Sequence, residues 1–335
     1  MSLILAVESS CDETSAALIQ QGKILANVVA TQTIHEKYGG VVPELASRAH
    51  QQHIIPVVHE AFNQAKVSKN DVNAVAFTRG PGLLGALLVG ASFAKSFALG
   101  LNVPLIEVNH MRAHVLAHFI DDPKPEFPFL CLTVSGGHTQ LVVVKSPLEM
   151  EVIGETQDDA VGEAFDKSAK LLGLPYPGGP MIDKHAKKGD PMKFQFSQTN
   201  MPDYTYSFSG IKTSILYFLR DQLKHNEHFI EENLDDLCAS IQHSLIDMLF
   251  EKLIKAAKDL KIKHVAIAGG VAANSGLRTR LEEEAEKRGW KAYIPAFQYC
   301  TDNAGMIAIA AHFLYEAKQF VGQDITPDPR LKISI

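Results

Sequence analysis

The feature that most constrains the fold of this chain is an internal duplication. A three-strand meander covers residues 3–31, and a second meander of similar texture covers residues 129–154. In each half the meander leads into a strand, a glycine-containing turn, a helix, another strand and a closing helix. The repeat predicts an α/β protein of two similar lobes with mixed sheets and an inter-lobe cleft, where ligands commonly bind. The predicted strands are residues 3–9, 14–20, 23–31, 72–77 and 104–108, and then 129–134, 139–144, 150–154, 264–268 and 291–294.

Two helical insertions interrupt the repeat, one over residues 42–66 and a longer one from residue 179 to about residue 260. We therefore place an N-terminal lobe at residues 1–125 and a C-terminal lobe at residues 126–335. The closing helix over residues 303–320 belongs to the second half of the sequence but can pack back on the first lobe.

Composition limits the location and the partners of the chain. Its 335 residues are 46% hydrophobic and 21% charged, as in compact soluble proteins. The longest apolar run, residues 82–101, is interrupted by glycines and Lys95, so it predicts a buried helix rather than a membrane span. No basic leader precedes the first strand and the cysteines form no C-x-x-C pair, so we expect a cytoplasmic protein. A net charge of −6 leaves RNA contacts to local basic clusters or to a partner subunit.

Two histidines and an aspartate form a candidate metal site. His110 and His114 are four residues apart at the start of a predicted helix, so their imidazoles share one helix face. Asp302 follows the last strand of the second half, as His110 follows that of the first, and the symmetry of a duplicated fold would bring the three together. This set leaves coordination positions open and suits iron(II), zinc or manganese. The competing roles are core packing for the histidines and a helix N-cap for Asp302, with Thr301 as a rival cap.

The residue after His110 argues against a peptidase. Zinc proteases of the H-E-x-x-H type place a general-base glutamate directly after the first histidine, whereas this chain has Met111. The pattern predicts a metal ion that orients a ligand rather than one that generates hydroxide.

Glycine-rich turns in the second half indicate a nucleotide site. Their backbone N–H groups are unobstructed by side chains, as phosphate contacts require. Each turn taken alone is equally compatible with an ordinary chain reversal, and the P-loop pattern G-x-x-x-x-G-K-[ST] is absent from the sequence. The turns are Ser135-Gly136-Gly137, Gly178-Gly179-Pro180, and Gly269-Gly270 followed by Asn274.

Polar residues near these turns have candidate roles as well. Asp166 and Asp183 suit the ribose hydroxyls of an adenosine, with solvated helix carboxylates as the alternative. His138 suits a phosphate or carbonyl oxygen, or a structural hydrogen bond. Asp12 and Glu13 are the matching acids of the first half, and Glu13 is a candidate base or a plain hairpin-turn residue.

Several motifs in order resemble those of the TsaD family, over essentially the whole chain. The resemblance implies the ASKHA fold (actin-like ATPase, RNase H-like). It also implies transfer of threonylcarbamoyl from its adenylate to N6 of an adenosine beside the anticodon, in tRNAs that read codons starting with A, with release of AMP. The motifs are V-E-S-S-C-D-E-T-S at residues 7–15, N-H-M-R-A-H at 109–114, V-S-G-G-H-T-Q at 134–140, F-D-K-x-A-K-L-L-G-L at 165–174, G-G-V-A-A-N at 269–274 and T-D-N at 301–303.

The resemblance also assigns residues and partners. It implies metal ligation, usually of iron, by His110, His114 and Asp302. In bacteria it implies a TsaB-like paralogue and a TsaE-like ATPase, with a homodimer as the assembly of the chain alone. The rival interpretations are a nucleotide-gated ASKHA scaffold, a sugar or carboxylic-acid kinase, and a metallopeptidase. The implied adenylate-binding residues are Thr133, Val134, Ser135, Gly136, Gly137, Asp166, Gly179, Asp183 and Asn274.

Overall fold

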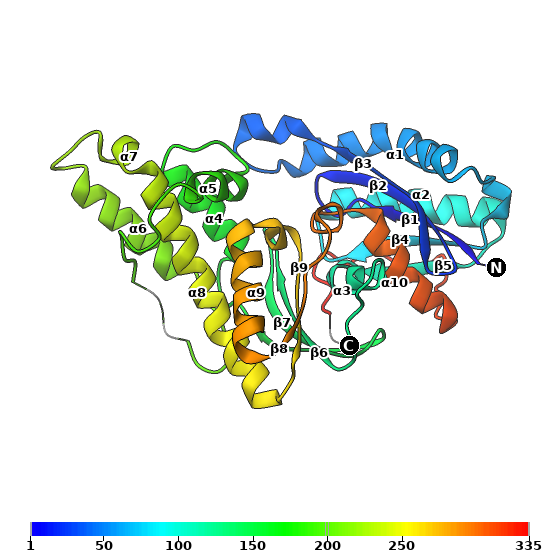
Figure 1. Cartoon of the computed structure of the whole chain (residues 1–335). Coiled ribbons are helices and arrows are strands. Elements are labelled where there is room, and N and C mark those ends of the chain that lie inside the picture. Colours follow the sequence, from blue (N-terminus) through cyan, green and yellow to red (C-terminus); the bar gives the residue numbers. More distant parts are fainter. Residues whose placement is uncertain (1, 198, 200, 334–335) are drawn as a thin grey trace. The chain divides into compact units, whose positions relative to one another are not determined.

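The structure is a computed structural model of the chain, and it describes residues 2–197, 199 and 201–333 (Figure 1). The chain divides into two compact units. The first unit comprises Met1–Pro125, Val144–Glu151 and Pro295–Ile335, and the second comprises Glu126–Val143 and Val152–Ile294. The C-terminal residues from 295 onward therefore belong to the first unit, where the closing helix packs on the sheet formed by the N-terminal strands.

The first unit is built on a five-stranded mixed sheet with the order β3-β2-β1-β4-β5. β1 pairs antiparallel with β2, and β2 pairs antiparallel with β3, which confirms the predicted meander. β4 is parallel to both β1 and β5. Every residue of β1 is buried, as expected for a central strand covered on both faces. The strands are β1 (Leu3–Glu8), β2 (Glu13–Gln20), β3 (Lys23–Thr31), β4 (Ala74–Gly80) and β5 (Leu105–Asn109).

Helices cover this sheet in two layers. α1 and α2 pack on each other and on the strands, while α10 packs on β1 to β5 and on α3. Figure 1 shows α1 above the strands of this sheet and α3 and α10 below them. The helices are α1 (Pro43–Ala65), α2 (Leu84–Leu101), α3 (His110–Leu116) and α10 (Ala304–Glu316).

The apolar helix α2 is only partly the buried helix that its sequence predicts. Ala91, Ala94 and Ala98 join the core of the first unit, but Leu88 is 46% exposed and Leu99 is 71% exposed. Among the described residues, α2 is the one helix long and apolar enough to cross a membrane, a test that core helices of soluble proteins also pass. Its small-residue face packs in the core, and part of the opposite face is in contact with solvent.

The second unit repeats the plan of the first. Its five-stranded sheet has the order β10-β9-β6-β7-β8, which is the order of the first sheet with each strand replaced by its counterpart. β9 is parallel to both β6 and β10. The two identical strand orders confirm the duplication predicted from the sequence. The strands are β6 (Phe129–Val134), β7 (Thr139–Ser146), β8 (Glu149–Glu155), β9 (His264–Ala268) and β10 (Lys291–Tyr293).

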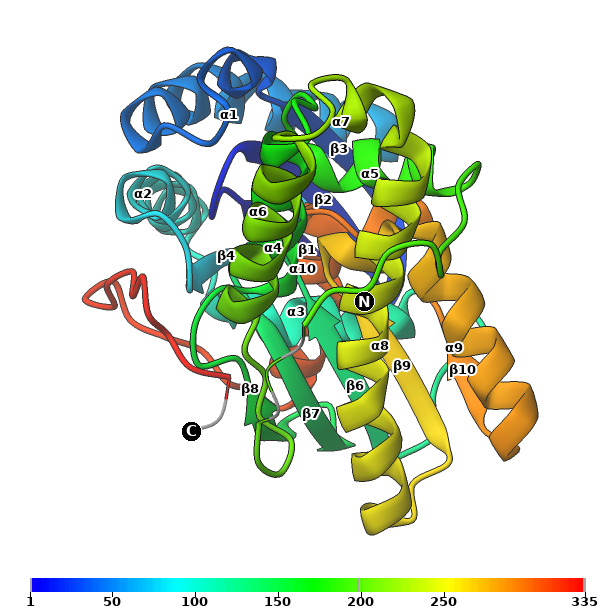
Figure 2. The ribbon, with the colours of Figure 1, turned by 90° about the vertical axis from the view of Figure 1, so that its left-hand side faces the viewer.

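Six helices accompany this sheet in the part of the chain that the structure describes. α4 packs on α5, α6 and α8, and α8 packs on α5, α7 and α9 (Figure 2). Both predicted helical insertions are present, since α1 occupies the first and α5 to α8 occupy the second. The helices are α4 (Val161–Leu171), α5 (Gly178–Ala186), α6 (Ser209–Gln222), α7 (Phe229–Glu232), α8 (Leu234–Leu260) and α9 (Ser275–Arg288).

Candidate active site

Two asparagines fix the helix ends that carry the candidate metal ligands. Asn109 ends β5, and its side-chain oxygen accepts the N–H of Arg112 at 3.0 Å, so α3 begins at His110. Asn303 caps α10 in the same way by accepting the N–H of Met306 at 3.0 Å. The equivalent positions of the two halves are therefore the asparagines, and the predicted alignment of His110 with Asp302 is wrong. His110 follows its cap, whereas Asp302 precedes its own and is free of the capping role.

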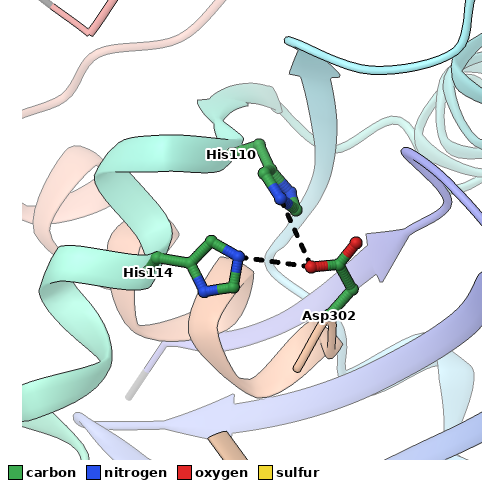
Figure 3. Close-up of side chains that lie close together, drawn as sticks. All are labelled: His110, His114 and Asp302. Carbon is green, nitrogen blue, oxygen red and sulfur yellow. Dashed lines mark hydrogen bonds and ion pairs between the residues drawn. The ribbon is translucent and has the colours of Figure 1, made fainter. Parts of the chain in front are cut away.

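The three predicted ligands nevertheless meet in the first unit, as Figure 3 shows. Asp302 Oδ1 lies 3.2 Å from His114 Nε2 and 3.4 Å from His110 Nε2. The ligand atoms of the triad lie within 4.8 Å of one another, and both histidines are buried. Two imidazole nitrogens and a carboxylate oxygen that converge in this way fit a single divalent metal ion.

Glu8 is a member of this site that the sequence argument missed. Its carboxylate is fully buried and accepts the Thr78 hydroxyl at 2.6 Å and the Ser10 N–H at 2.5 Å. Its Oε2 lies 3.2 Å from His110 Nδ1, the ring nitrogen that does not face Asp302. Histidines that bind metals commonly donate their second N–H to a carboxylate, which fixes the ring. One signal pointed to Glu8: it is the only charged residue in the strand L-I-L-A-V-E.

The surroundings of the triad shift the pKa values of the two histidines in opposite directions. Burial favours neutral imidazoles, but at His110 the charges of Asp302 and Glu8 outweigh it and raise the pKa. At His114 burial prevails and lowers the pKa. Burial acts to raise the pKa of Asp302 and of Glu8, yet His110 more than offsets it and both are lowered. The site thus gathers two carboxylates around one positive charge, a balance that a metal cation would also satisfy.

The acids of the first turn lie in the same unit. Asp12 precedes β2 and Glu13 begins it. Burial and then the negative charges of Asp302 and Asp12 raise the pKa of Glu13 well above its usual range. These influences disfavour the ionised form of Glu13, which favours a hydrogen-bond donor over a base.

The second unit contains a cavity of about 270 Å³. Five of the predicted adenylate-binding residues line it, from four separate segments of the chain: Gly136, Asp166, Gly179, Asp183 and Asn274. Pro180 and Gly270, from the predicted glycine-rich turns, also line it, whereas Phe165, Pro177 and Val271 had no predicted role of their own. Phe165 directly precedes Asp166 in the F-D-K motif. The predicted role of Asp166 was therefore the one sequence signal that could have indicated Phe165 as part of the site.

Hydrogen bonds hold the polar residues of this cavity in place. Asp166 Oδ1 accepts the N–H groups of Gly178 at 2.8 Å and Gly179 at 3.2 Å. Asp183 Oδ1 accepts the N–H of Ser275 at 3.1 Å and its hydroxyl at 2.7 Å. Asn274 caps α9 through the N–H of Leu277. Each aspartate uses one oxygen to order a turn, so neither is a merely solvated carboxylate.

The glycines of the turns at and beside the cavity differ in whether the fold itself requires a glycine at their positions. Gly269 has a φ of 90°, and a Cβ there would lie 2.4 Å from the carbonyl oxygen of Val134, so a side chain is excluded. A Cβ on Gly136, Gly137 or Gly270 would meet no atom within 4 Å, and none of the three has a positive φ. Packing therefore does not explain these three glycines, whereas close approach of a ligand to the backbone does.

The other predicted binding residues lie outside the cavity lining. Thr133 and Val134 are buried within β6. Ser135 donates its N–H to the His138 carbonyl at 2.9 Å, and its hydroxyl accepts the His138 N–H at 3.1 Å. These two bonds close the turn between β6 and β7, in which Gly137 also lies. His138 belongs to the second unit, whereas Asp12 and Glu13 belong to the first.

Fold and sites together define a class, the duplicated two-unit α/β proteins of the ASKHA type. Two solved structures share the fold at low sequence identity. Full-length HypF in the phosphate- and nucleotide-bound form has a TM-score of 0.64 at 15% identity, over 93% of this chain and 46% of that one. HypF of T. kodakarensis has a TM-score of 0.60 at 12% identity, over 96% and 49%. The predicted ASKHA fold is confirmed.

The chain belongs to the TsaD family. The family model described as tRNA N6-adenosine threonylcarbamoyltransferase matches residues 23–309. A relative of that name from Cytophaga hutchinsonii is 64% identical over 330 residues, which cover 98% of this chain and 96% of the relative. Another from Thermosipho africanus is 47% identical over 338 residues, which cover 99% and 100%. The resemblance inferred from the motifs is therefore confirmed.

Proposed function

We propose that the chain transfers the threonylcarbamoyl group from L-threonylcarbamoyladenylate to N6 of an adenosine beside the anticodon, in tRNAs that read codons starting with A. The bond between the carbamoyl carbon and the phosphate oxygen breaks, and a bond to N6 forms. AMP leaves with the electron pair, and N6 loses one proton. The observation that carries the proposal is the family match over residues 23–309, which includes the whole triad and every residue of the glycine-lined cavity.

The adenylate is assigned to the cavity of the second unit. Gly136 and Gly270 supply backbone N–H groups next to open space, which suits the phosphate. Asp166 has a second carboxylate oxygen beyond the one that orders the turn, which suits a ribose hydroxyl. The second oxygen of Asp183 lies 3.2 Å from Lys187 Nζ, so Asp183 would accept a ribose hydroxyl beside that ammonium group. Thr133 and Val134 contribute as the strand that positions the Ser135 to His138 turn, and Gly137 leaves space beside it.

One divalent metal ion is assigned to His110, His114 and Asp302, with iron(II) proposed and zinc as the alternative. When bound, such an ion polarises a carbonyl or carboxylate oxygen as a Lewis acid. Glu8 holds the His110 ring so that Nε2 faces Asp302. The amine of adenosine is a weak nucleophile, so positioning contributes more than a strong base. The raised pKa of Glu13 supports a hydrogen-bonding role for that residue, with Asp12 acting on it through charge, and His138 is assigned to its own turn.

The tRNA is proposed to bind partly through other subunits. The net charge of −6 gives the chain itself no general attraction to a polyanion. A TsaB-like paralogue and a TsaE-like ATPase are the proposed partners in bacteria, and a homodimer is proposed for the chain alone. A cytoplasmic location is proposed, since tRNA is modified there.

The geometry weakens the peptidase alternative further. A protease base must reach the water on the metal, whereas Glu8 contacts Nδ1 of His110, away from the nitrogen that faces Asp302. Burial and the nearby negative charges disfavour the ionised form of Glu13 that a base would need. A nucleotide-gated scaffold would leave a buried triad of two histidines and a carboxylate without a purpose.

A single-turnover assay tests the proposal. Purified protein is mixed with synthetic threonylcarbamoyl-AMP and unmodified tRNA, with and without the two partner proteins, and the modified nucleoside is measured by mass spectrometry. His114→Ala and Asp302→Ala should lower the yield at least a hundredfold, because each removes one ligand of three. His59→Ala, an exposed histidine on α1, is the matched control and should retain full activity.

Two glycine substitutions, one in the cavity and one outside it, test the adenylate site separately from the metal site. Gly270→Val places a side chain in open space of the cavity, so the protein should fold but bind the adenylate at least tenfold more weakly. Gly100→Val on α2 also meets no neighbouring atom and is the control. Absence of product from the parent protein with metal and partners present would instead favour the scaffold.

A further inference from the structure

A second cavity, of about 670 Å³, lies in the first unit and has no part in the proposed reaction. It is bounded by the end of β5, by α3, by α10 and by the C-terminal segment after α10. Its volume is in the range of small-molecule sites, roughly 300–1,000 Å³. The C-terminal segment is fixed over it, because Val321 N–H donates to the Leu105 carbonyl at 2.9 Å and Asn109 Nδ2 donates to the Lys332 carbonyl at 2.9 Å.

The walls of this cavity carry an excess of positive charge. Arg79 forms an ion pair with Glu107, with 2.8 Å between Nη1 and Oε2, and these two charges cancel. Arg112, Lys318 and Lys332 also line the cavity, and none of them has an ion pair among the described residues. Three cations therefore face a cavity whose one carboxylate already has a partner.

Arg112 is the most constrained of the three cations. It is half-buried, and its Nη2 donates to the Leu148 carbonyl at 2.7 Å, while its Nε is buried without any acceptor in the described chain. A buried guanidinium without a counter-charge is costly, and an anion would relieve that cost. Burial also lowers the pKa of Arg112, which remains charged at neutral pH.

The rest of the lining is mostly apolar, with Asn109 and Gln319 as its uncharged polar side chains. Leu116, Leu148, Leu314, Val321 and Leu331 contribute to it from four separate parts of the first unit. A fully hydrated ion such as sulfate would leave these walls unused, whereas a ligand with an apolar body would cover them. The cations and the apolar walls together suit a molecule with one anionic end and one apolar end.

We propose that this cavity is a second binding site, for a small amphipathic anion, a carboxylate or a phosphate monoester with an apolar group. Arg112 serves as its counter-charge. The site is separate from the metal triad although both use α3, because Arg112 is two residues from His110 and from His114, and residues two apart on a helix do not share a face. The proposal does not depend on the transfer reaction.

Calorimetric titration of the full-length chain tests this site with three probes of equal chain length: octanoate, octyl phosphate and octanol. We expect one equivalent of octanoate or octyl phosphate to bind, and octanol to bind at least tenfold more weakly because it lacks the charge. The tighter of the two anions identifies the head group. Arg112→Met and Lys332→Met should each weaken binding of that anion, Arg112→Met by about tenfold or more.

Two features keep the test decisive. Lys332 is exposed, so Lys332→Met reports on the site even if Arg112→Met fails to fold. Arg48→Met removes an equivalent charge from exposed α1, where Arg48 pairs with Glu44, and should leave binding unchanged. The proposal is overturned if neither anion binds, if octanol binds as tightly as they do, or if the folded Arg112 and Lys332 variants both keep the parental affinity.

Discussion

Glu8 is the charged residue that contacts Nδ1 of His110, a nitrogen that also lies 3.2 Å from the Ser10 hydroxyl. Replacing it by glutamine keeps the shape of the side chain but removes the charge that faces His110 Nδ1 at 3.2 Å. We expect Glu8→Gln to weaken divalent metal binding by about tenfold to a hundredfold, the usual cost of losing a carboxylate that supports a metal-binding histidine. Competition with a chromophoric chelator, for zinc in air and for iron(II) under nitrogen, measures the affinity.

The matched control for this change is Glu107→Gln. Glu107 is also on a strand of the first unit, but it pairs with Arg79 and does not contact the triad. It should leave metal affinity within twofold of the parent. Parental affinity in a folded Glu8→Gln protein would show that the hydrogen bonds of Ser10 and the helix suffice to orient His110, contrary to the prediction.

Some residues of the candidate metal site could be predicted from the sequence and others could not. Helical spacing placed His110 and His114 on one helix face but left core packing as an alternative, and their meeting with Asp302 was predicted from the duplication even though the assumed alignment was wrong. The alignment failed because capping asparagines, rather than ligands, are the repeated residues. Glu8 escaped notice because its partner is about a hundred residues away, and no local pattern encodes a contact of that range.

Among the elements, α1 is joined to the turn between β1 and β2 by one buried histidine. His50 Nδ1 lies 2.8 Å from the Thr14 hydroxyl, and its Nε2 lies 3.0 Å from the Cys11 carbonyl. A carbonyl only accepts, so Nε2 carries the hydrogen and Nδ1 accepts from Thr14, which suits a neutral ring. Burial accordingly lowers the pKa of His50.

This arrangement predicts a pH dependence of stability. Between the lowered pKa in the folded state and the usual value of about 6.5, the unfolded chain binds more protons than the folded one, so the free energy of unfolding falls with falling pH. Above about pH 6.5 this loss disappears. His50→Gln should cost about 1–3 kcal/mol at neutral pH through its hydrogen bonds, and should show a shallower decline on acidification. Urea unfolding at pH about 7.5 and about 5.5 measures both.

The control for this titration is His59→Gln, which changes an exposed histidine on the same helix. Its stability should follow that of the parent at both pH values. An unchanged decline in His50→Gln would place the acid sensitivity of the first unit in other groups.

At the level of elements, strand positions were more predictable than helix environments. The predicted strand at residues 264–268 coincides with β9, because a short β-branched run between polar residues has few alternatives. The exposed face of α2 was not predictable, since an apolar helix gives no periodic signal of which side is buried. The cavity walls formed by Phe165 and Pro177 likewise depend on packing between segments rather than on either segment alone.

At the scale of the whole molecule, the first unit depends on both ends of the chain. α10 lies about 290 residues after β2 in sequence, yet it packs on β1 to β5 and places Asp302 beside His110. The side-chain hydroxyl of Ser15 accepts the Ala304 N–H at 2.8 Å, and Asn27 accepts the Gly305 N–H at 2.9 Å. The internal duplication predicts α10 as a closing helix, and the contacts of the folded chain assign it to the first unit.

A chain that ends at Ile294 should therefore lose the first unit and keep the second. Met306, Ile307 and Ile309 are buried in α10, and burying each contributes roughly 1.5–3 kcal/mol. Together they approach the whole stability of a typical domain, about 5–15 kcal/mol. Hydrogen exchange read by mass spectrometry should show loss of protection in peptides of β1 to β3 and retained protection in peptides of β6 and β9, which belong to the second unit.

A point substitution separates loss of packing from loss of chain length. Ile307→Asp introduces an unpaired charge into the buried face of α10, so it should reproduce the loss of protection in β1 to β3 in the full-length chain. Glu316→Asp, at the exposed end of the same helix, should leave exchange unchanged. If β1 to β3 stayed protected in both the truncated chain and Ile307→Asp, the N-terminal strands would fold without α10, and the discontinuous first unit would not be a cooperative one.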